Sequence, residues 1–362
     1  MPDTVKNPNP FPEIDKKGMY EILRAFPEQF RWACEIGKIA PGFPKEIKSN
    51  HFLILGMGGS AIGGDLLNSY LSVLPGAEHI RITVNRGYAL PKNIDKDINI
   101  IASSYSGNTE ETLSAFEEAR ELTENILCIS AGGELSRKAA EHKIPVIKIP
   151  IGLQPRAAIG YSFFPMLFAL VKTNALKESA IESTEKALEE LRPLLAEKSK
   201  EYSDANIESN LAYQIAKKIK GTIPVIYSSA QGLDSVNIRW RCQIQENAKN
   251  MAFGNLLPEM NHNEINSFSF PEGLAQKISM IFLTDPYDHP RVKVRFNALR
   301  SIIENNVKQV ITLESDAKNL LARMFDIIYL GDWVSYYLAI LNNVDPTEIP
   351  LITQLKNFLS EE

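Results

Sequence analysis

The stretch HFLILGMGGSAIGGD, residues 51–65, most constrains what this chain can fold into. An apolar run from His51 to Leu55 stops at closely spaced glycines that enclose one serine, Ser60. Glycine reaches positive φ and lets the backbone approach a ligand. The residues from Ala61 can begin a helix, whose N-terminal N–H groups and dipole favour an anion. The stretch predicts a buried strand followed by a phosphate-binding turn, and a corner that needs glycine only for packing is the alternative.

A second stretch, SSYSGNTEET at residues 103–112, follows another strand pattern and offers hydroxyl groups beside a new helix start. Together the two stretches suit one small dianionic phosphate. The alternative is an N-capped helix, with Ser106 or Thr109 as the cap and acidic residues in the first turn. The predicted phosphate-binding residues are Gly58, Gly59, Ser60, Ser104, Ser106 and Thr109.

The glycine run also matches the dinucleotide fingerprint G-x-G-x-x-A over residues 56–61. Such a site needs an acidic residue at the end of the next strand to bind the ribose. This chain has Val84-Asn85-Arg86-Gly87 there. The dinucleotide interpretation is therefore disfavoured.

The composition limits the partners that the protein can have. A net charge of −5 provides no overall positive field for a nucleic acid or an anionic membrane. The three cysteines lack metal-ligand spacing and disulfide-scaffold density, and the five histidines show no close ligand spacing. The first residues lack the apolar core of a signal peptide. We expect a cytoplasmic protein without a bound metal, a nucleic-acid partner or a membrane partner.

The order of patterns along the 362 residues indicates an α/β protein with two domains. Short β-branched runs alternate with amphipathic runs, which predicts parallel sheets with helices on both faces. The predicted strands are 51–55, 80–85, 98–103, 125–130, 144–149, 223–228, 277–283 and 308–313. The predicted helices are 14–39, 61–74, 109–123, 134–142, 157–174, 207–220, 232–250, 289–305, 316–342 and 347–359, with 251–268 irregular.

These patterns divide the chain into four segments. Residues 1–44 are predicted to form a tail and a lead-in helix, and 45–178 the first, phosphate-binding domain. Residues 179–206, rich in Glu, Lys, Ser and Ala, are predicted to be a helical connector. The second domain with a C-terminal helix is predicted over 207–362.

The runs GMGGSAIGGD and SYSGNTEET resemble the sugar isomerase (SIS) domain, which binds phosphosugars. The resemblance implies two SIS-type αβα domains and assigns the phosphate to Ser60, Ser104, Ser106 and Thr109. It leaves isomerases, aminosugar synthases and non-catalytic sugar-sensing regulators open.

The second half of the chain offers residues for proton transfer. Glu246 lies in a predicted helix, and His262 follows sixteen residues later in PEMNHNEI. Moving a proton between C1 and C2 of an aldose phosphate needs a carboxylate base, and ring opening needs an acid/base that works near neutral pH. Taken singly, a helical glutamate is more often a solvated residue and a histidine between asparagines an ordinary loop residue.

The whole chain resembles the bifunctional phosphoglucose/phosphomannose isomerases through GMGGS, SYSGNTEET, PRA, ENAK and PEMNHNEI, over residues 45 to 360. The resemblance implies that Glu246 shuttles the proton through a cis-enediol and that His262 opens the ring. It implies that Arg156 stabilises the enediolate and that Lys356, in the last helix, helps ring opening. It also implies a cofactor-free enzyme that acts on a sugar phosphate, and a homodimer in which the partner donates the histidine to a shared site.

Dual specificity rests on the segment before the last helix. Ordinary phosphoglucose isomerases are expected to have glutamine seven positions before the lysine, whereas this chain has Ile349, with Thr347 nearby. Loss of the glutamine would leave room for the C2 epimer, mannose 6-phosphate. A phosphosugar regulator stays the main alternative, although no DNA-binding helix pair precedes the first domain. Aminosugar synthesis from glutamine would need a leading cysteine, and residue 2 is Pro2.

Overall fold

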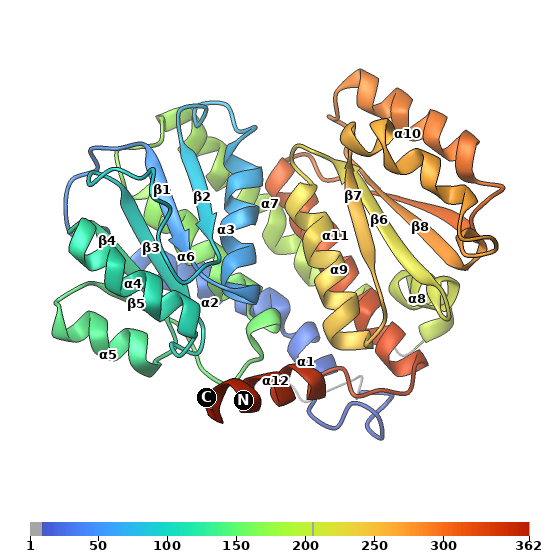
Figure 1. Ribbon diagram of the computed structural model, residues 1–362, viewed down its shortest axis with the longest axis horizontal. Coiled ribbons are helices and arrows are strands. Elements are labelled where there is room, and N and C mark those ends of the chain that lie inside the picture. Colours follow the sequence, from blue (N-terminus) through green and yellow to red (C-terminus); the bar gives the residue numbers. More distant parts are fainter. Residues whose placement is uncertain (1–8, 205, 362) are drawn as a thin grey trace. The chain divides into compact units, whose positions relative to one another are not determined.

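The computed structural model describes residues 9–204 and 206–361, so residues 1–8 of the predicted tail lie outside the described residues. The chain forms two compact units (Figure 1). The N-terminal unit comprises Ala25–Pro193 with Asn319–Ala322. Among the described residues, the C-terminal unit comprises those up to Arg24, those between Leu194 and Lys318 and those from Arg323 onward.

The N-terminal unit is built on a parallel five-stranded sheet with the order β2-β1-β3-β4-β5. Its strands are β1 His51–Leu55, β2 Arg81–Asn85, β3 Asn99–Ser104, β4 Ile126–Ser130 and β5 Val146–Lys148. Its helices are α2 Phe26–Ile39, α3 Gly58–Leu71, α4 Glu110–Leu122, α5 Gly133–Glu141, η1 Pro155–Ala157 and α6 Ile159–Val171. The long helix α7, Glu178–Tyr202, has residues of both units.

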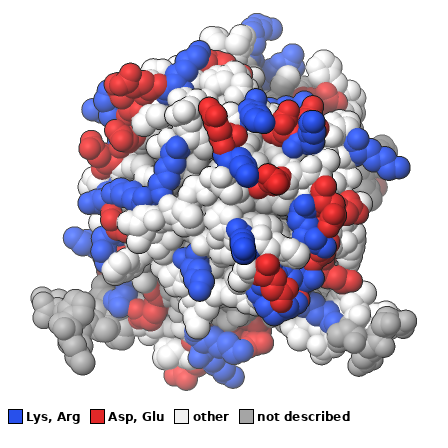
Figure 2. Space-filling model, turned by 90° about the vertical axis from the view of Figure 1, so that its left-hand side faces the viewer, with Lys and Arg blue, Asp and Glu red and all other residues white. Residues whose placement is uncertain are grey.

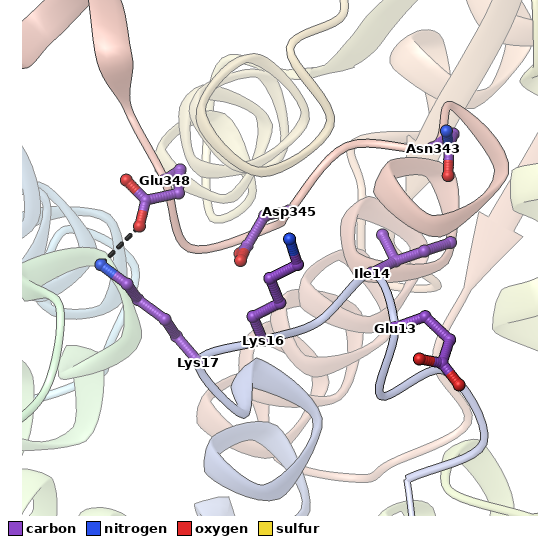
Figure 3. A pocket seen from close by; sticks show the side chains of 7 residues that line it. All are labelled: Glu13, Ile14, Lys16, Lys17, Asn343, Asp345 and Glu348. Atoms are coloured by element: carbon purple, nitrogen blue, oxygen red, sulfur yellow. Dashed lines mark ion pairs between the residues drawn. The ribbon is translucent and has the colours of Figure 1, made fainter.

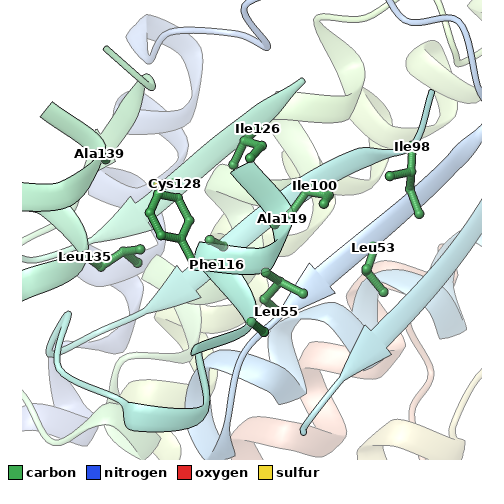
Figure 4. Packing of buried hydrophobic residues seen from close by; sticks show 12 residues of the cluster. Leu53, Leu55, Ile98, Ile100, Phe116, Ala119, Ile126, Cys128, Leu135 and Ala139 are labelled. Atoms are coloured by element: carbon green, nitrogen blue, oxygen red, sulfur yellow. The ribbon is translucent and has the colours of Figure 1, made fainter. Parts of the chain in front are cut away.

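Alternate strand residues of this sheet point to opposite faces, because the side-chain period of a strand is two. Leu53, Leu55 and Ile100 pack against Phe116 of α4 and Leu135 of α5 (Figure 4). Helices α3 and α6 pack on each other, and Gly64 of α3 lies so close to the sheet that a Cβ there would be 2.8 Å from Ile54 Cδ1. The sheet is therefore covered on both faces, as its apolar strands predict.

The C-terminal unit is built on a parallel four-stranded sheet with the order β7-β6-β8-β9. Its strands are β6 Ile223–Ser229, β7 Phe253–Leu257, β8 Ile278–Thr284 and β9 Gln309–Glu314. Its α-helices are α1 Met19–Arg24, α8 Leu211–Ile219, α9 Asp234–Ala248, α10 Pro290–Ile303, α11 Leu320–Leu341 and α12 Pro350–Glu361. Its 3-10 turns are η2 Ile207–Ser209, η3 Glu259–His262, η4 Glu264–Ser269 and η5 Ala275–Lys277.

Helices also lie on both faces of this second sheet. Tyr227 and Phe282 pack with Phe296 of α10 on one face. On the other face, Asn237 of α9 donates to the Ile226 carbonyl at 2.9 Å, and Trp240 Nε1 donates to the Ile327 carbonyl of α11 at 2.9 Å. The predicted α/β class with two parallel sheets and helices near both ends of the chain is confirmed.

Two predictions about individual elements were wrong. The helix predicted over 14–39 is two helices, of which α1 ends just before Ala25 and α2 begins just after it. The break occurs here because Pro27 lacks an N–H and favours the first turn of a new helix. The segment predicted as irregular contains β7, FGNLL, in which Phe253 is the only residue of a type enriched in strands, whereas glycine and asparagine are depleted in strands. Gly254 fits there because β6 lies so close that a Cβ would be 2.3 Å from the Ile226 carbonyl oxygen.

Helix α11 is long and apolar enough to cross a membrane by composition, yet 89% of its most apolar window is buried inside the protein. Helix α11 is therefore a core helix. On the face that Figure 2 shows, Lys and Arg side chains alternate with Asp and Glu side chains. That face carries no continuous basic surface.

The three cysteines differ in environment, which gives a first testable prediction. Burial raises the pKa of Cys34 and of Cys128 to about 12, whereas Cys242 is exposed. Because the thiolate is the reactive form, we expect a thiol reagent at pH 8 to modify Cys242 rapidly and the other two only after denaturation. Absorbance of the released thiol-reagent chromophore counts the thiols. The Cys242→Ser variant should lose the fast phase, and its persistence would contradict the assignment.

Candidate active site

The first loop of the predicted phosphate site joins β1 to α3. The helix begins at Gly58, three residues earlier than predicted, so its first N–H groups belong to the glycines themselves. Gly58 has φ of 48°, which favours glycine. A Cβ on Gly59 would be 2.5 Å from the Pro155 carbonyl oxygen, so this position has no room for a side chain. The first two residues of α3 thus have no side chains, at a helix end whose first N–H groups lack intrahelical partners.

The second loop, residues 105–109, joins β3 to α4 and contacts the first. Ser60 Oγ accepts a hydrogen bond from the Tyr105 N–H at 3.1 Å. Ser104 is fully buried, and its hydroxyl lies 2.9 Å from the Thr109 hydroxyl. These contacts bring Ser60, Ser104 and Thr109 together at the carboxyl ends of neighbouring parallel strands, where open α/β sheets bind their ligands.

The hydroxyls of the second loop do not cap α4 in the way the alternative interpretation requires. Thr109 occupies the N-cap position, yet its side chain makes no capping hydrogen bond. Ser106 is exposed, and its Oγ accepts from the Asn108 N–H at 3.2 Å, just outside the helix. Neither hydroxyl therefore caps the first turn of α4.

A third loop, which follows β4, supports the second one. Gly107 has φ of 73°, and a Cβ there would be 1.8 Å from the Gly132 carbonyl oxygen. The Leu135 N–H donates to the Gly107 carbonyl at 2.8 Å, and the Glu134 N–H donates to Asn108 Oδ1 at 2.9 Å. Sequence reasoning missed this supporting loop, although the paired glycines 132 and 133 marked it as a turn.

Arg156 lies in the turn η1, directly against the glycine loop. Its side chain is 4% exposed, and its backbone nitrogen would be 3.1 Å from a Cβ on Gly59. Gln29 of α2 holds this turn, because its Nε2 donates to the Ala157 carbonyl at 2.9 Å and its Oε1 accepts from the Gly160 N–H at 2.8 Å. The structure therefore brings Arg156 to the predicted phosphate site. Gln29, inside a helix far earlier in the chain, carried no sequence signal for this role.

Glu246 lies in the last turn of α9 in the C-terminal unit and is half-buried. The helix is anchored to α11 by a buried ion pair, in which Arg239 Nη2 lies 2.7 Å from Asp332 Oδ2. Gln243 Nε2 donates to the other oxygen of Asp332 at 2.9 Å. Glu246 is thus carried by a helix whose buried side is fixed by polar contacts.

His262 ends the turn η3 after β7 and is exposed. The loop beneath it is held by Glu264, whose carboxylate accepts from the Tyr227 hydroxyl at 2.5 Å and from Asn255 Nδ2 at 2.6 Å. Burial raises the pKa of Tyr227, and the hydrogen bond to Glu264 adds to this shift. The motif PEMNHNEI includes Glu264, but its local sequence does not indicate that this residue anchors the histidine loop.

The structure does not bring Glu246 and His262 together within the unit. Helix α9 runs antiparallel to the strands that it connects, so its last turn lies at the start of β7. His262 follows the end of β7. Five strand residues span roughly 16 Å, so the two side chains belong to opposite ends of the sheet.

Lys356 lies on α12 with an exposed side chain. Before this helix, Thr347 is buried and Ile349 is partly buried, with its carbonyl accepting from the Thr353 N–H at 3.0 Å. In the described part of the chain, no group of three or more His, Cys, Asp or Glu residues is placed to hold a metal ion.

Comparisons with known proteins cover nearly the whole chain. Residues 208–359 match the family described as bacterial phospho-glucose isomerase C-terminal SIS domain. A bifunctional phosphoglucose/phosphomannose isomerase from Caldicellulosiruptor bescii is 41% identical over 345 residues, which are 95% of this chain and 99% of that protein. The protein of that name from Aquifex aeolicus is 33% identical over 95% of this chain and 98% of its own length.

Solved structures support the fold. A glucose-6-phosphate isomerase like protein from Thermus thermophilus superimposes with a TM-score of 0.61 at 15% identity. The match covers 96% of this chain and 100% of that chain. At this identity the likeness concerns the fold, and it agrees with the SIS-type architecture that the motifs imply.

Proposed function

This chain belongs to the bifunctional phosphoglucose/phosphomannose isomerase family, and we infer that it interconverts glucose 6-phosphate and mannose 6-phosphate with fructose 6-phosphate. The observation that carries this conclusion is the high identity across nearly the whole length of relatives that bear this name. The protein is an aldose–ketose isomerase, and we propose separate roles for its phosphate-binding residues and for Glu246, His262, Arg156 and Lys356.

The non-reacting phosphate is proposed to bind at the two loops of the N-terminal unit. No side-chain cap hydrogen bond is made at the start of α3 or of α4, and the hydroxyls of Ser60, Ser104 and Thr109 are brought together there. Exposed Ser106 would add a fourth hydroxyl. Binding energy from the phosphate can then hold the reacting carbons in place, and it contributes to catalysis without taking part in the chemistry.

Glu246 is proposed to be the base. Its carboxylate would take the proton from C2 of the open-chain aldose, the electrons of that C–H bond would form the C1–C2 double bond, and the π electrons of the C1 carbonyl would move to O1. O1 takes up a proton, which gives the cis-enediol. Loss of the proton of the C2 hydroxyl then forms the C2 carbonyl, and the electrons of the C1–C2 double bond take the proton from Glu246 at C1, which yields the ketose. The half-buried position at a fixed helix end supports this role, because a base has to be held within reach of the substrate.

The other three residues are proposed to assist. Arg156, buried beside the glycine loop, would stabilise negative charge on the enediolate. His262 would open and close the ring, and Lys356 would help at the ring oxygen. As histidine titrates near neutral pH in the free amino acid, it suits both proton donation and acceptance.

We further propose a homodimer in which each site combines Glu246 of one chain with His262 of the other. The support is the separation of the two residues at opposite ends of one sheet, although one substrate molecule has to meet both. Symmetric dimers are the commonest assemblies, and they place two such composite sites around one axis.

Mixing two inactive variants tests the composite site. After unfolding and refolding together, Glu246→Gln and His262→Ala chains should regain about a quarter of wild-type turnover, because half of the dimers are mixed and each of these has one intact site. Each variant refolded alone is the control. Sites built within one chain would give no recovery in the mixture.

The reaction itself is tested by incubating purified protein with fructose 6-phosphate and following both aldose phosphates. Production of glucose 6-phosphate and mannose 6-phosphate is expected. A non-catalytic phosphosugar regulator would bind fructose 6-phosphate and produce neither. The ratio of the two products measures how far Ile349 and Thr347 tolerate the C2 epimer.

We also propose that the two SIS domains span residues 45–178 and 207–362, with 179–206 as connector. The family match at 208–359 and the two separate sheets support these limits. A soluble, cytoplasmic enzyme of sugar-phosphate metabolism fits the phosphorylated substrate and three cysteines that form no disulfide.

A further inference from the structure

The last turn of α9 carries Glu246 within the motif ENAK, residues 246–249, of which the proposed reaction uses only the glutamate. Asn247 and Lys249 have contacts of their own, and both lie close to the proposed base in the chain. These contacts fix the C-terminal turn of α9.

Asn247 holds the turn from its buried side. It is fully buried, and its Nδ2 donates to Ser335 Oγ of α11 at 2.9 Å. The Ser335 hydroxyl donates onward to the Asp332 carbonyl at 2.7 Å, and Asp332 binds Arg239 and Gln243 through its carboxylate. Residues 239, 243 and 247 follow the four-residue helical spacing, so α9 is tied to α11 at successive turns.

Lys249 holds the turn from its end. It adopts a left-handed conformation with φ of 52°, which is uncommon for a residue with a side chain. Its Nζ donates to the Asn247 carbonyl at 3.0 Å and also to the Asp345 carbonyl. Asn342 Nδ2 donates to the Ala248 carbonyl at 3.1 Å. Carbonyls that a helix end leaves unpaired are thereby satisfied, and the ammonium lies at the negative end of the helix dipole.

The acceptor Asp345 belongs to the linker between α11 and α12, in which Thr347 is buried. The Thr347 N–H donates to Asp345 Oδ1 at 2.7 Å. Glu348 pairs with Lys17, as Figure 3 shows. Both residues line a surface pocket of about 490 Å³. Lys249 therefore ties the turn that carries Glu246 to a second segment of the C-terminal unit.

We propose that Lys249 and Asn247 are positioning residues for Glu246. They fix the axial position and rotation of the last turn of α9, so that the carboxylate stays where C1 and C2 of the substrate are presented. The inference rests on the proposed role of Glu246 as the base. A displacement of about 1 Å of a catalytic group can cost about 100-fold in rate, so small shifts of this turn matter.

The test compares Lys249→Met and Ser335→Ala with wild type, using fructose 6-phosphate as substrate. Both variants should lower kcat about tenfold while KM changes less than about twofold, because the phosphate contacts lie on other elements. Lys249→Arg should retain most of kcat, since guanidinium also donates to two carbonyls. Lys220→Met is the matched control, because Lys220 is the C-cap of α8 in the same unit.

A double-mutant cycle separates positioning from general destabilisation. Glu246→Asp already displaces the carboxylate, so adding Lys249→Met should lower kcat further by much less than tenfold. The losses of unfolding free energy should instead add. Equal kcat losses in both backgrounds would overturn the inference, because they would show that Lys249 does not act through residue 246.

The outcomes also separate this inference from the proposed function. If Glu246→Gln is inactive but Lys249→Met and Ser335→Ala keep wild-type kcat, the positioning inference is wrong and the base assignment stands. If Glu246→Gln retains turnover, the base assignment is wrong and the inference falls with it.

Discussion

Replacing Glu246 by glutamine is expected to lower kcat for the interconversion of fructose 6-phosphate and glucose 6-phosphate by about 10²- to 10⁴-fold, the usual contribution of a general base. The amide keeps the size of the side chain but cannot accept the proton. KM should change little, because the residues proposed to bind the phosphate lie on α3, α4 and their loops. A coupled spectrophotometric assay gives both constants.

Solvent deuterium sharpens this test. Wild-type enzyme should incorporate deuterium at C2 of the aldose phosphate in heavy water, and the glutamine variant should lose this exchange. Glu304→Gln is the matched control, because Glu304 also ends a helix of the same unit. Near wild-type turnover of the Glu246→Gln variant would contradict the assignment.

Replacing Gly107 by alanine is expected to raise KM for fructose 6-phosphate about 10- to 100-fold, which corresponds to losing one or two hydrogen bonds to a charged group. A Cβ at this position would be 1.8 Å from the Gly132 carbonyl oxygen, so the loop 105–109 has to move. That movement separates the N–H groups and hydroxyls proposed to hold the phosphate. Initial rates over a range of substrate concentrations measure KM.

A φ-matched glycine controls for backbone strain alone. Gly18 has the same φ of 73° and has no heavy atom within 4 Å of a Cβ built there. Gly18→Ala therefore carries the left-handed strain without the clash, and its KM should equal that of wild type. If Gly107→Ala also kept the wild-type KM, the loop would not bind the phosphate.

Local sequence patterns were sufficient for the α/β class and for most elements. The run His51–Leu55 is a strand with the predicted limits, and the glycines after it open a helix. Such signals are local, because apolar period and glycine's access to positive φ depend on neighbouring residues only. Strand β7 was not predicted, because its formation depends on a contact with a strand that is distant in the sequence. Its FGNLL sequence pairs as a strand only because β6 accepts it at close range.

The candidate site shows the same division. The amino-acid sequence was enough to predict which side chains bind phosphate and which transfer protons, because it gives the chemical type of each residue and the spacing between them. Only the folded chain shows that Arg156 lies against Gly59, that Gln29 holds its turn, and that Glu246 and His262 lie at opposite ends of one sheet. These three contacts and separations depend on how elements that are distant in the chain pack together, and a local sequence pattern does not determine that packing.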